Sequence, residues 1–242
     1  MKNLILASTA LALTAGMAFA EGQTVRMGTE GAYPPYNFIN DAGEVDGYER
    51  EIGDEMCKRA EVTCEWVTNE WDSIIPNLTS GNYDTIMAGM SITEERKEVI
   101  SFTQNYIPPA YSAYMALSAD ADLTGGVIAA QASTIQAGYV AETGATLLEF
   151  ATYDETVAAV RNGEADAVFA DKDALVPAVE ESGGELLFAG ADVQLGEGVG
   201  LGLRQSDTEL KDKFDAAITS MKEDGTINAA IKKWFGEEAA AY

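Results

Sequence analysis

The pattern of apolar and polar positions switches repeatedly between a strand-like and a helix-like period along the first third of the chain. Short, continuous apolar runs indicate buried strands, and longer stretches with apolar residues three or four positions apart indicate helices. We expect strands at 24–28, 64–67 and 84–87, and helices at 49–60 and 71–79. This alternating order predicts a doubly wound α/β unit.

A second alternating set follows a break at Pro108 and Pro109, where two prolines forbid a continuing helix and favour an extended connector. In this set we expect strands at 127–130, 147–150 and 167–169, and helices at 135–142 and 154–162. The chain then has a glycine-alternating strand at 196–203, helices at 207–223 and 226–235, and a tail at 237–242 that we expect to fray. The glycines of 196–203 do not fit a phosphate-binding loop, so we interpret them as allowing close packing or a hinge return.

An internal repeat links the two sets. Residues 78–89 (LTSGNYDTIMAG) match residues 160–171 (VRNGEADAVFAD) in a helix end, a glycine turn, an aspartate and a strand. The match predicts two similar lobes, although a chance recurrence of a common helix-to-strand turn would look the same. If the repeat is real, Gly89 and Asp171 lie at corresponding strand ends, where open α/β sheets bind ligands.

The segment 75–96 has the composition of a carboxylate site. Its small residues, Gly89 and Ser91, allow a ligand to approach the backbone, and Thr93 begins a capped helix that contains Arg96. Free backbone N–H groups, a hydroxyl and a guanidinium are groups that hold a carboxylate. We expect a cleft with Ser91 and Arg96 on one wall and Asp171 on the other.

Residues 1–20 predict an export signal, because Lys2 is followed by an apolar run and then by small residues before Glu21. The run is too short to span a bilayer, so a transmembrane anchor is the weaker alternative. Residues 21–242 keep 14 of the 15 basic residues against all 40 acidic ones, which gives 14 − 40 = −26. This charge argues against a nucleic-acid partner and is typical of a solubilising surface.

Cys57 and Cys64 are the two cysteines of the chain, and in an exported protein they form a candidate disulfide. Two free thiols are the alternative. The chain has no histidine, which excludes histidine-dependent catalysis; with the cysteines bridged, it also excludes imidazole and thiolate metal sites. We expect no cofactor and no metal, although a carboxylate-only metal site stays open.

Several stretches together match a known family: 28–36 (GTEGAYPPY), 47–52 (GYEREI), the cysteine segment, 91–96 (SITEER) with 102–103, and 224–236 at its two ends. Over nearly its full length, the chain resembles the periplasmic amino-acid-binding proteins of ABC importers, which include lysine-arginine-ornithine, histidine and glutamine binders. The resemblance implies an α/β, two-lobed periplasmic-binding-protein fold of type II, with doubly wound lobes joined by two hinge strands. It places lobe 1 at 21–108 plus 197–242 and lobe 2 at 109–196.

The resemblance also implies roles for the polar site residues. Arg96 corresponds to the clamp for the α-carboxylate of an amino acid, helped by Ser91 and Gly89, and Asp171 corresponds to the acid that holds the α-ammonium. A guanidinium fork suits a carboxylate bidentately. The alternatives are a surface arginine paired with a neighbouring glutamate and an aspartate that caps a helix.

Tyr33 and Trp71 correspond to the aromatic pair that encloses the ligand side chain, with core packing as the alternative. In the second lobe the family often has G-T-T or G-S-T, whereas this chain has Ala132-Ser133-Thr134-Ile135. The alignment can slip by one there. We expect the Thr134 hydroxyl to bind the ligand beside the backbone amide of Ile135, because a helix start offers unpaired N–H groups.

Glu30 decides the expected ligand class, because a carboxylate at the pocket mouth suits a cationic side chain; the alternative is a structural acid bonded to loop amides. We expect an L-amino acid such as arginine, lysine, ornithine or histidine, with arginine first, bound by a periplasmic monomer that docks on a membrane ABC permease and is not an enzyme. A glutamine or opine binder of the same family is one alternative, and a periplasmic dehydratase on the same scaffold is another. A structural or adhesion domain would bind no ligand.

Overall fold

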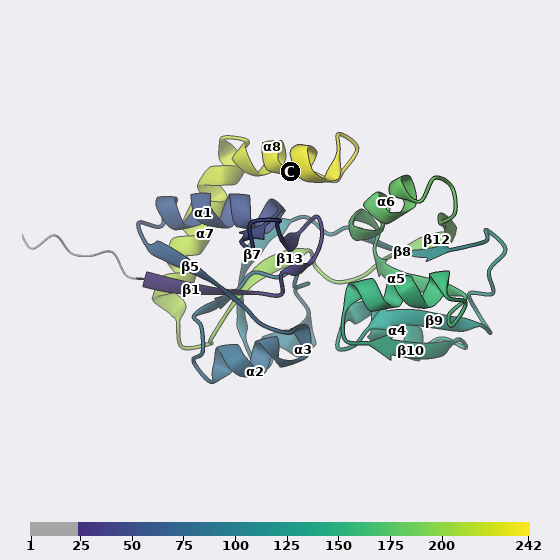
Figure 1. Ribbon diagram of the computed structural model, residues 1–242. Coiled ribbons are helices and arrows are strands. Elements are labelled where there is room, and N and C mark those ends of the chain that lie inside the picture. Colours follow the sequence, from purple (N-terminus) through teal and green to yellow (C-terminus); the bar gives the residue numbers. More distant parts are fainter. Residues whose placement is uncertain (1–23) are drawn as a thin grey trace, which may run out of the picture.

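The computed structural model describes residues 24–242, in which the strands form two five-stranded sheets and one small three-stranded sheet (Figure 1). In the first large sheet the order is β5-β1-β6-β13-β7, and in the second it is β10-β9-β11-β8-β12. The first contains β1 (Thr24–Thr29), β5 (Thr63–Thr68), β6 (Thr85–Ile86), β7 (Ser101–Ile107) and β13 (Val199–Leu203). The second contains β8 (Tyr111–Ala116), β9 (Val127–Gln131), β10 (Thr146–Phe150), β11 (Ala167–Asp171) and β12 (Leu187–Gln194).

Each large sheet has a parallel core of three strands, β5-β1-β6 and β10-β9-β11, followed by antiparallel strands. We call the first sheet with its helices lobe 1 and the second lobe 2. The helices of lobe 1 lie on both sides of its sheet, with α1, α7 and α8 on one side and α2 and α3 on the other (Figure 1). The helices are α1 (Tyr48–Arg59), α2 (Ile74–Thr79), α3 (Glu94–Lys97), α4 (Ile135–Ala141), α5 (Tyr153–Arg161), α6 (Lys172–Glu181), α7 (Thr208–Glu223) and α8 (Thr226–Phe235).

Every strand and helix expected from the sequence is present, with ends shifted by a few residues. The helix expected at 71–79 is a 3₁₀ turn (Trp71–Ser73) that leads into α2. Sequence reasoning missed α6, because Pro177 lies inside it, and β12, whose mostly exposed or half-buried residues show no clear alternation. It also missed the small sheet of β2 (Ala32–Tyr33), β3 (Asn37–Ile39) and β4 (Val45–Asp46), whose strands are too short to show a period. The apolar pattern gave no strands for β7 and β8, which lie on either side of the expected extended connector at Pro108 and Pro109.

The internal repeat is structural. In lobe 1 the Asp84 carboxylate accepts a hydrogen bond from the Arg26 amide of β1 at 3.0 Å, and in lobe 2 the Asp166 carboxylate accepts one from the Val127 amide of β9 at 2.7 Å. The amide of each aspartate donates back to the carbonyl of the same partner, at 2.9 and 2.8 Å. The glycine three residues earlier has a φ of 81° in one copy and 74° in the other. The prediction of two lobes of similar construction is therefore confirmed.

The chain passes between the sheets twice, from β7 to β8 and from β12 to β13 (Figure 1). The expected lobe boundaries, at 108/109 and 196/197, fall within these two connections and stay predictions. Gly198 has a φ of 90°, and a Cβ there would lie 2.5 Å from the carbonyl oxygen of Ile107, the last residue of β7. A Cβ at Gly200 would lie 2.7 Å from the side chain of Ile92. The interpretation of these glycines as a close-packing feature is confirmed.

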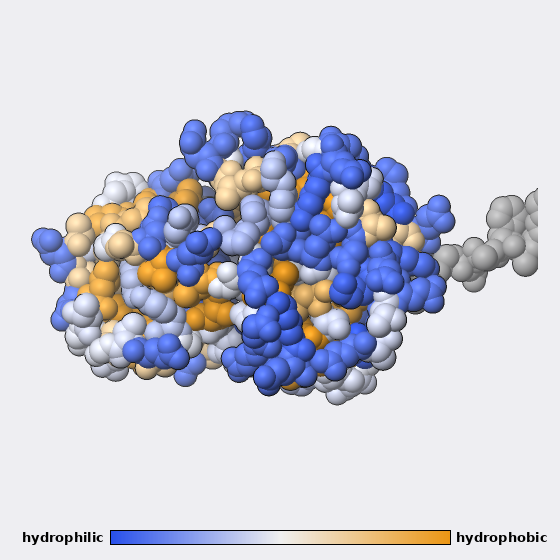
Figure 2. Space-filling view, turned by 180° about the vertical axis from the view of Figure 1, so that it is seen from behind, coloured by the Kyte–Doolittle hydropathy of each residue, from blue (hydrophilic) through white to orange (hydrophobic). Residues whose placement is uncertain are grey.

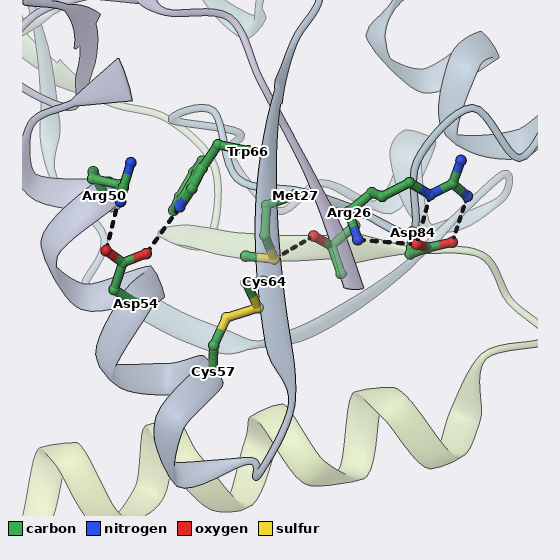
Figure 3. The surroundings of a disulfide bond; sticks show 9 residues. Arg26, Met27, Arg50, Asp54, Cys57, Cys64, Trp66 and Asp84 are labelled. Atoms are coloured by element: carbon green, nitrogen blue, oxygen red, sulfur yellow. Dashed lines mark hydrogen bonds and ion pairs between the residues drawn. A yellow bond between two sulfur atoms is a disulfide. The ribbon is translucent and has the colours of Figure 1, made fainter. Parts of the chain in front are cut away.

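The disulfide between Cys57 and Cys64 is present and joins the last turn of α1 to the adjacent strand β5 (Figure 3). The two Cα atoms are 6.1 Å apart. On the far side of β1, Arg26 and Asp84 form an ion pair at 2.9 Å (Figure 3). The bridge therefore fixes the edge strand of lobe 1 to the helix that packs over the sheet.

Replacing both cysteines by serine is expected to lower the free energy of unfolding by about 2–3 kcal/mol. The disulfide closes a short loop, with a sequence separation of 7, and the chain-entropy model gives a loss of this size for so short a loop. Urea denaturation of the oxidised protein and of the double variant measures the difference. Equal unfolding midpoints with equal slopes would show that the bridge does not stabilise the fold.

The expectation that the tail 237–242 frays is wrong. The hydroxyl of Tyr242 donates to the Asn105 carbonyl at 2.9 Å, and the ammonium of Lys222 lies 3.9 Å from the centre of its ring. Asn228 hydrogen-bonds both the amide and the carbonyl of Tyr242. The aromatic residue at the end of the tail supplies the packing and the bonds that hold the tail to lobe 1.

Hydrophilic residues cover much of lobe 1 on the face shown in Figure 2, as the net charge predicts. Within residues 24–242 the helices are all too short or too polar to traverse a bilayer. The same residues contain no cluster of three or more acidic or cysteine side chains placed to hold a metal ion. The predicted export signal, residues 1–20, lies outside the described part of the chain.

Candidate functional site

A cavity of about 460 Å³, counting the space open to solvent, lies where the strand ends of lobe 1 face those of lobe 2. Residues from both lobes line it, so it is a cleft site as the sequence predicts. The structure brings all eight predicted site residues together in its lining: Glu30, Tyr33, Trp71, Gly89, Ser91, Arg96, Thr134 and Asp171. Their roles as ligand contacts stay predictions.

Arg96 supplies a half-buried guanidinium to the cavity from α3. Thr93 caps this helix by accepting the Arg96 amide at 3.1 Å. The guanidinium donates to the Ser91 carbonyl at 2.8 Å and to the Ser133 carbonyl of lobe 2 at 3.2 Å, and its carbon lies 5.3 Å from the Trp71 ring centre. Burial lowers the pKa of Arg96 to about 10, and the charge of Asp171 opposes that shift. The group stays cationic at neutral pH.

Asp171 supplies the opposite charge from the end of β11. Its carboxylate accepts the Tyr33 hydroxyl at 2.7 Å and the Gln136 side-chain amide at 2.9 Å. Burial raises its pKa to about 6, and the hydrogen bonds together with the charge of Arg96 limit the rise. Asp171 stands at the N-cap position of α6, but its side chain makes no capping bond. The carboxylate thus lies in the cavity and does not cap the helix.

The backbone amide of Gly89 is not free for a ligand. Gly89 has a φ of 61°, and its amide donates to Oε1 of the buried Glu49 at 2.7 Å. A buried carboxylate needs such donors, so it takes the amide that the sequence leaves for a ligand. Ser91 is 8% exposed, and its carbonyl is one of the two that hold Arg96.

Thr134 begins α4, and its hydroxyl is used within lobe 2. It accepts the Ala137 amide at 3.1 Å, as an N-cap does, and donates to the Gln131 carbonyl at 2.7 Å. The hydroxyl proton is therefore not free for a ligand. The backbone amides at the start of α4, including that of Ile135, are the groups with no intrahelical partner.

Glu30, Trp71 and Tyr33 also line the cavity. The carboxylate of Glu30 accepts the Gln131 side-chain amide at 2.6 Å, and burial raises its pKa to about 7, with the charges of Glu49 and other acids adding to the rise. Trp71 is 8% exposed, and its indole N–H has no hydrogen-bond partner within residues 24–242. Glu30 and Trp71 therefore offer a carboxyl group, an aromatic face and an indole N–H donor that is not used by the protein.

The stacking of Tyr33 is with a core residue. Its ring lies 5.2 Å from that of Tyr36 and meets Tyr153 edge-on at 5.4 Å. The core-packing alternative therefore holds for part of the Tyr33 ring, while its hydroxyl reaches Asp171.

The family follows from comparison with known proteins. Residues 25–237 match the model of the bacterial extracellular solute-binding proteins, family 3. The chain belongs to this family. The lysine/arginine/ornithine-binding periplasmic protein of Escherichia coli is 31% identical over 257 residues, with 97% of each chain covered. The octopine-binding periplasmic protein of Rhizobium meliloti is 31% identical over 291 residues with the same coverage.

A solved structure confirms the fold class of this solute-binding protein. A periplasmic His/Glu/Gln/Arg/opine family-binding protein from Silicibacter pomeroyi, in complex with lysine, is 77% identical and superposes with a TM-score of 0.89. The match covers 90% of this chain and 100% of that one. The architecture is the two-lobed periplasmic-binding-protein fold that the sequence predicts.

Sequence reasoning missed several residues that line the cavity of the solute-binding protein. Gln131 and Gln136 flank the turn between β9 and α4, and their side-chain amides hold Glu30 and Asp171. A polar residue at each edge of a turn that follows a buried strand is the signal that points to them. Phe169 and Tyr153 complete the apolar wall, and nothing in the sequence separates them from ordinary core residues.

Three side-chain hydrogen bonds of the site cross between the lobes of the solute-binding protein. They run from Tyr33 to Asp171, from Gln131 to Glu30, and from Arg96 to the Ser133 carbonyl. Each joins a residue of lobe 1 to one of lobe 2. Side chains that line the cavity therefore also hold the lobes against each other.

Proposed function

We propose that this protein captures a free cationic L-amino acid in the interlobe cavity and delivers it to an ABC permease. The proposal rests on one cavity whose lining contains a half-buried guanidinium, that of Arg96, and two half-buried carboxylates, those of Asp171 and Glu30. The lysine in the similar Silicibacter pomeroyi structure and the lysine/arginine/ornithine specificity named for the Escherichia coli relative support it.

The α-amino and α-carboxyl groups of the ligand match Asp171 and Arg96 in charge. A guanidinium has five N–H donors, and the bonds of Arg96 to two carbonyls leave others for a carboxylate. The amides at the start of α4 supply further donors. Asp171 can exchange the hydroxyl of Tyr33 for an ammonium, which is a stronger, charge-assisted donor.

The part of the cavity lined by Glu30 and Trp71 suits a cationic side chain. Glu30 provides a carboxylate, and Trp71 provides an aromatic face that already lies beside the Arg96 guanidinium. A second cation over the same kind of surface gains a cation–π attraction. Arginine comes first among the candidates, ahead of lysine, ornithine and histidine; glutamine and opine binding are the alternatives within the family.

Closure of the lobes follows from contacts on both walls. A ligand held by Arg96 in lobe 1 and by Asp171 and α4 in lobe 2 has more contacts when the lobes are together, so binding favours the closed state. The lobes of this movement are 21–108 with 197–242, and 109–196, and the two connections between the sheets act as hinges. The protein works as a periplasmic monomer after loss of residues 1–20.

Fragments of one ligand test the proposal. L-Lysine, cadaverine, which lacks the α-carboxylate, and 6-aminohexanoate, which lacks the α-ammonium, share the same side chain. We expect calorimetric titration to detect tight binding of L-lysine and binding weaker by about a hundredfold or more for each fragment, because each leaves one buried charge without its partner. Equal affinity for all three would contradict the proposal.

Glu30→Gln is expected to weaken the binding of L-arginine and L-lysine about tenfold to a hundredfold and to leave any binding of L-glutamine unchanged. The variant removes a charge without a change of size, and a lost charge-assisted bond in a buried site is of this order. Because a bound cation lowers the pKa of Glu30 from about 7, the wild-type affinity should rise as pH rises from about 6 to 8. An equal loss for charged and neutral ligands would remove Glu30 from the side-chain pocket.

A dehydratase for a prephenate-like substrate is the second candidate. Two half-buried carboxyl groups with raised pKa values, Glu30 at about 7 and Asp171 at about 6, are candidates for proton donors in a cleft. The presence of both the Asp171 carboxylate and the Arg96 guanidinium in one cavity favours an α-amino acid zwitterion. The dehydratase is therefore the second candidate. Incubation with prephenate, followed by direct measurement of product, decides between the two: product formation would reverse the ranking.

A further inference from the structure

Glu49 is a fully buried acid that does not line the cavity, yet its hydrogen bonds lead to two segments that do, the Gly89 turn and the loop that follows Glu30. It is the second residue of α1, with 0% exposure. We propose that Glu49 is a positioning residue of the amino-acid site. Its carboxylate holds the Gly89 turn and the loop that follows Glu30 in fixed positions relative to each other. The inference rests on the proposed function, since it concerns the geometry of that site.

One oxygen of the Glu49 carboxylate fixes the turn at Gly89. Oε1 accepts the Gly89 amide at 2.7 Å, which sets the orientation of the peptide that precedes Ser91 and Arg96. Oε1 also accepts the hydroxyl of Tyr106. Tyr106 lies at the end of β7, directly before the first connection to lobe 2.

The other oxygen of the Glu49 carboxylate fixes the loop that follows Glu30. Oε2 accepts the side-chain amide of Asn37 at 2.7 Å, and the carbonyl oxygen of that same amide accepts the Gly31 backbone N–H at 2.7 Å. Gly31 follows Glu30 directly. The charge of Glu49 also contributes to the raised pKa of Glu30, as expected of groups that lie close together.

Every hydrogen bond of this network leads to Glu49, which is the final acceptor. Gly31 donates to Asn37, Asn37 donates to Glu49, and the Gly89 amide and the Tyr106 hydroxyl donate to Glu49 as well. A carboxylate accepts from all of these donors, whereas a carboxamide of the same shape has only one accepting oxygen. An amide at position 49 would turn its NH₂ toward the Asn37 NH₂, and a flip of Asn37 would move the clash to Gly31.

The position of Glu49 also favours the ionised form that these bonds require. It lies in the first turn of α1, where the helix dipole stabilises a negative charge. Burial raises its pKa, and the bonds from Tyr106, Gly89 and Asn37 counter that rise. A single buried anion thus ties the Gly89 turn and the Glu30 loop to the strand that leads out of lobe 1.

The first test is calorimetric titration of Glu49→Gln with L-lysine. We expect affinity about tenfold to a hundredfold below that of the wild type, as for other residues that orient a binding group. Glu55→Gln, a change of the same kind on the more exposed side of α1, where Glu55 pairs with Arg59 at 2.8 Å, is the matched control and should bind as the wild type does. Thermal unfolding of each variant separates a loss of stability from a loss of affinity.

The second test restores the bonds with the charge moved. In the double variant Glu49→Gln with Asn37→Asp, the carboxylate now at position 37 accepts from Gly31 and from the side-chain NH₂ introduced at position 49, so every donor again has an acceptor. We expect this double variant to recover most of the affinity. A folded Glu49→Gln protein with wild-type affinity, or a folded double variant with no recovery, would overturn the proposal.

Two further outcomes are distinguishable. If Glu49→Gln does not fold, Asn37→Ala, which leaves Glu49 its other donors, is titrated in its place, and wild-type affinity in that variant overturns the inference. If the wild-type protein binds no amino acid, the proposed function fails, and the inference fails with it.

Discussion

Arg96→Ala is expected to lose binding of L-arginine and L-lysine by a factor of about thirty to several thousand. The removal of one partner from a buried, hydrogen-bonded charge pair costs about 2–5 kcal/mol, and each 1.4 kcal/mol is a factor of ten. The half-buried guanidinium is bonded to carbonyls of both lobes, and its loss also removes the charge that limits the pKa of Asp171. Calorimetric titration measures the loss.

Arg96→Lys is the matched control, because it separates the effect of the positive charge from the effect of the guanidinium shape. A lysine keeps the positive charge but cannot bind a carboxylate with two parallel bonds. We expect an affinity between those of the wild type and Arg96→Ala. Near-normal affinity in a folded Arg96→Ala protein would refute the assignment of this residue to the α-carboxylate.

Asp171→Asn is expected to give the second-largest loss, about thirtyfold or more, because the α-ammonium then faces an amide in place of a carboxylate. The wild-type affinity should also depend on pH through this group. In the free protein the pKa of Asp171 is about 6, and a bound ammonium lowers it. The affinity is therefore complete above the free-state pKa and falls as the pH drops through about 6.

The Glu30→Gln background separates this titration from that of Glu30. In it, the fall in affinity between about pH 7 and pH 5 should persist with Asp171 and disappear when Asp171→Asn is added. A pH dependence that is unchanged by Asp171→Asn would assign the titration to another group.

The sequence is informative where a residue and its local neighbours decide the outcome. Thr93 and the following acids predict the capped start of α3, and with it the position of Arg96. The repeat of glycine turn, aspartate and strand predicts that Gly89 and Asp171 lie at corresponding strand ends, and the same hydrogen bonds form around the repeated aspartate in both lobes. Together with the family resemblance, this local chemistry places all eight candidate residues at one cavity.

The sequence is uninformative where a partner comes from far along the chain. The Gly89 amide is taken by Glu49, forty residues earlier, and no local pattern signals that a buried acid lies beneath the turn. The Gln131 side chain bonds to Glu30 across the lobes, 101 positions away. Such pairings depend on how the lobes pack, so only the folded structure shows which polar groups stay free for a ligand.

The most direct test of the central claim is calorimetric titration of the ligand-free protein with each of the twenty amino acids. The account predicts tight, one-to-one binding of L-arginine or of another basic amino acid, with the neutral and acidic ones weaker. Binding of glutamine or of an acidic amino acid without binding of the basic ones would contradict it.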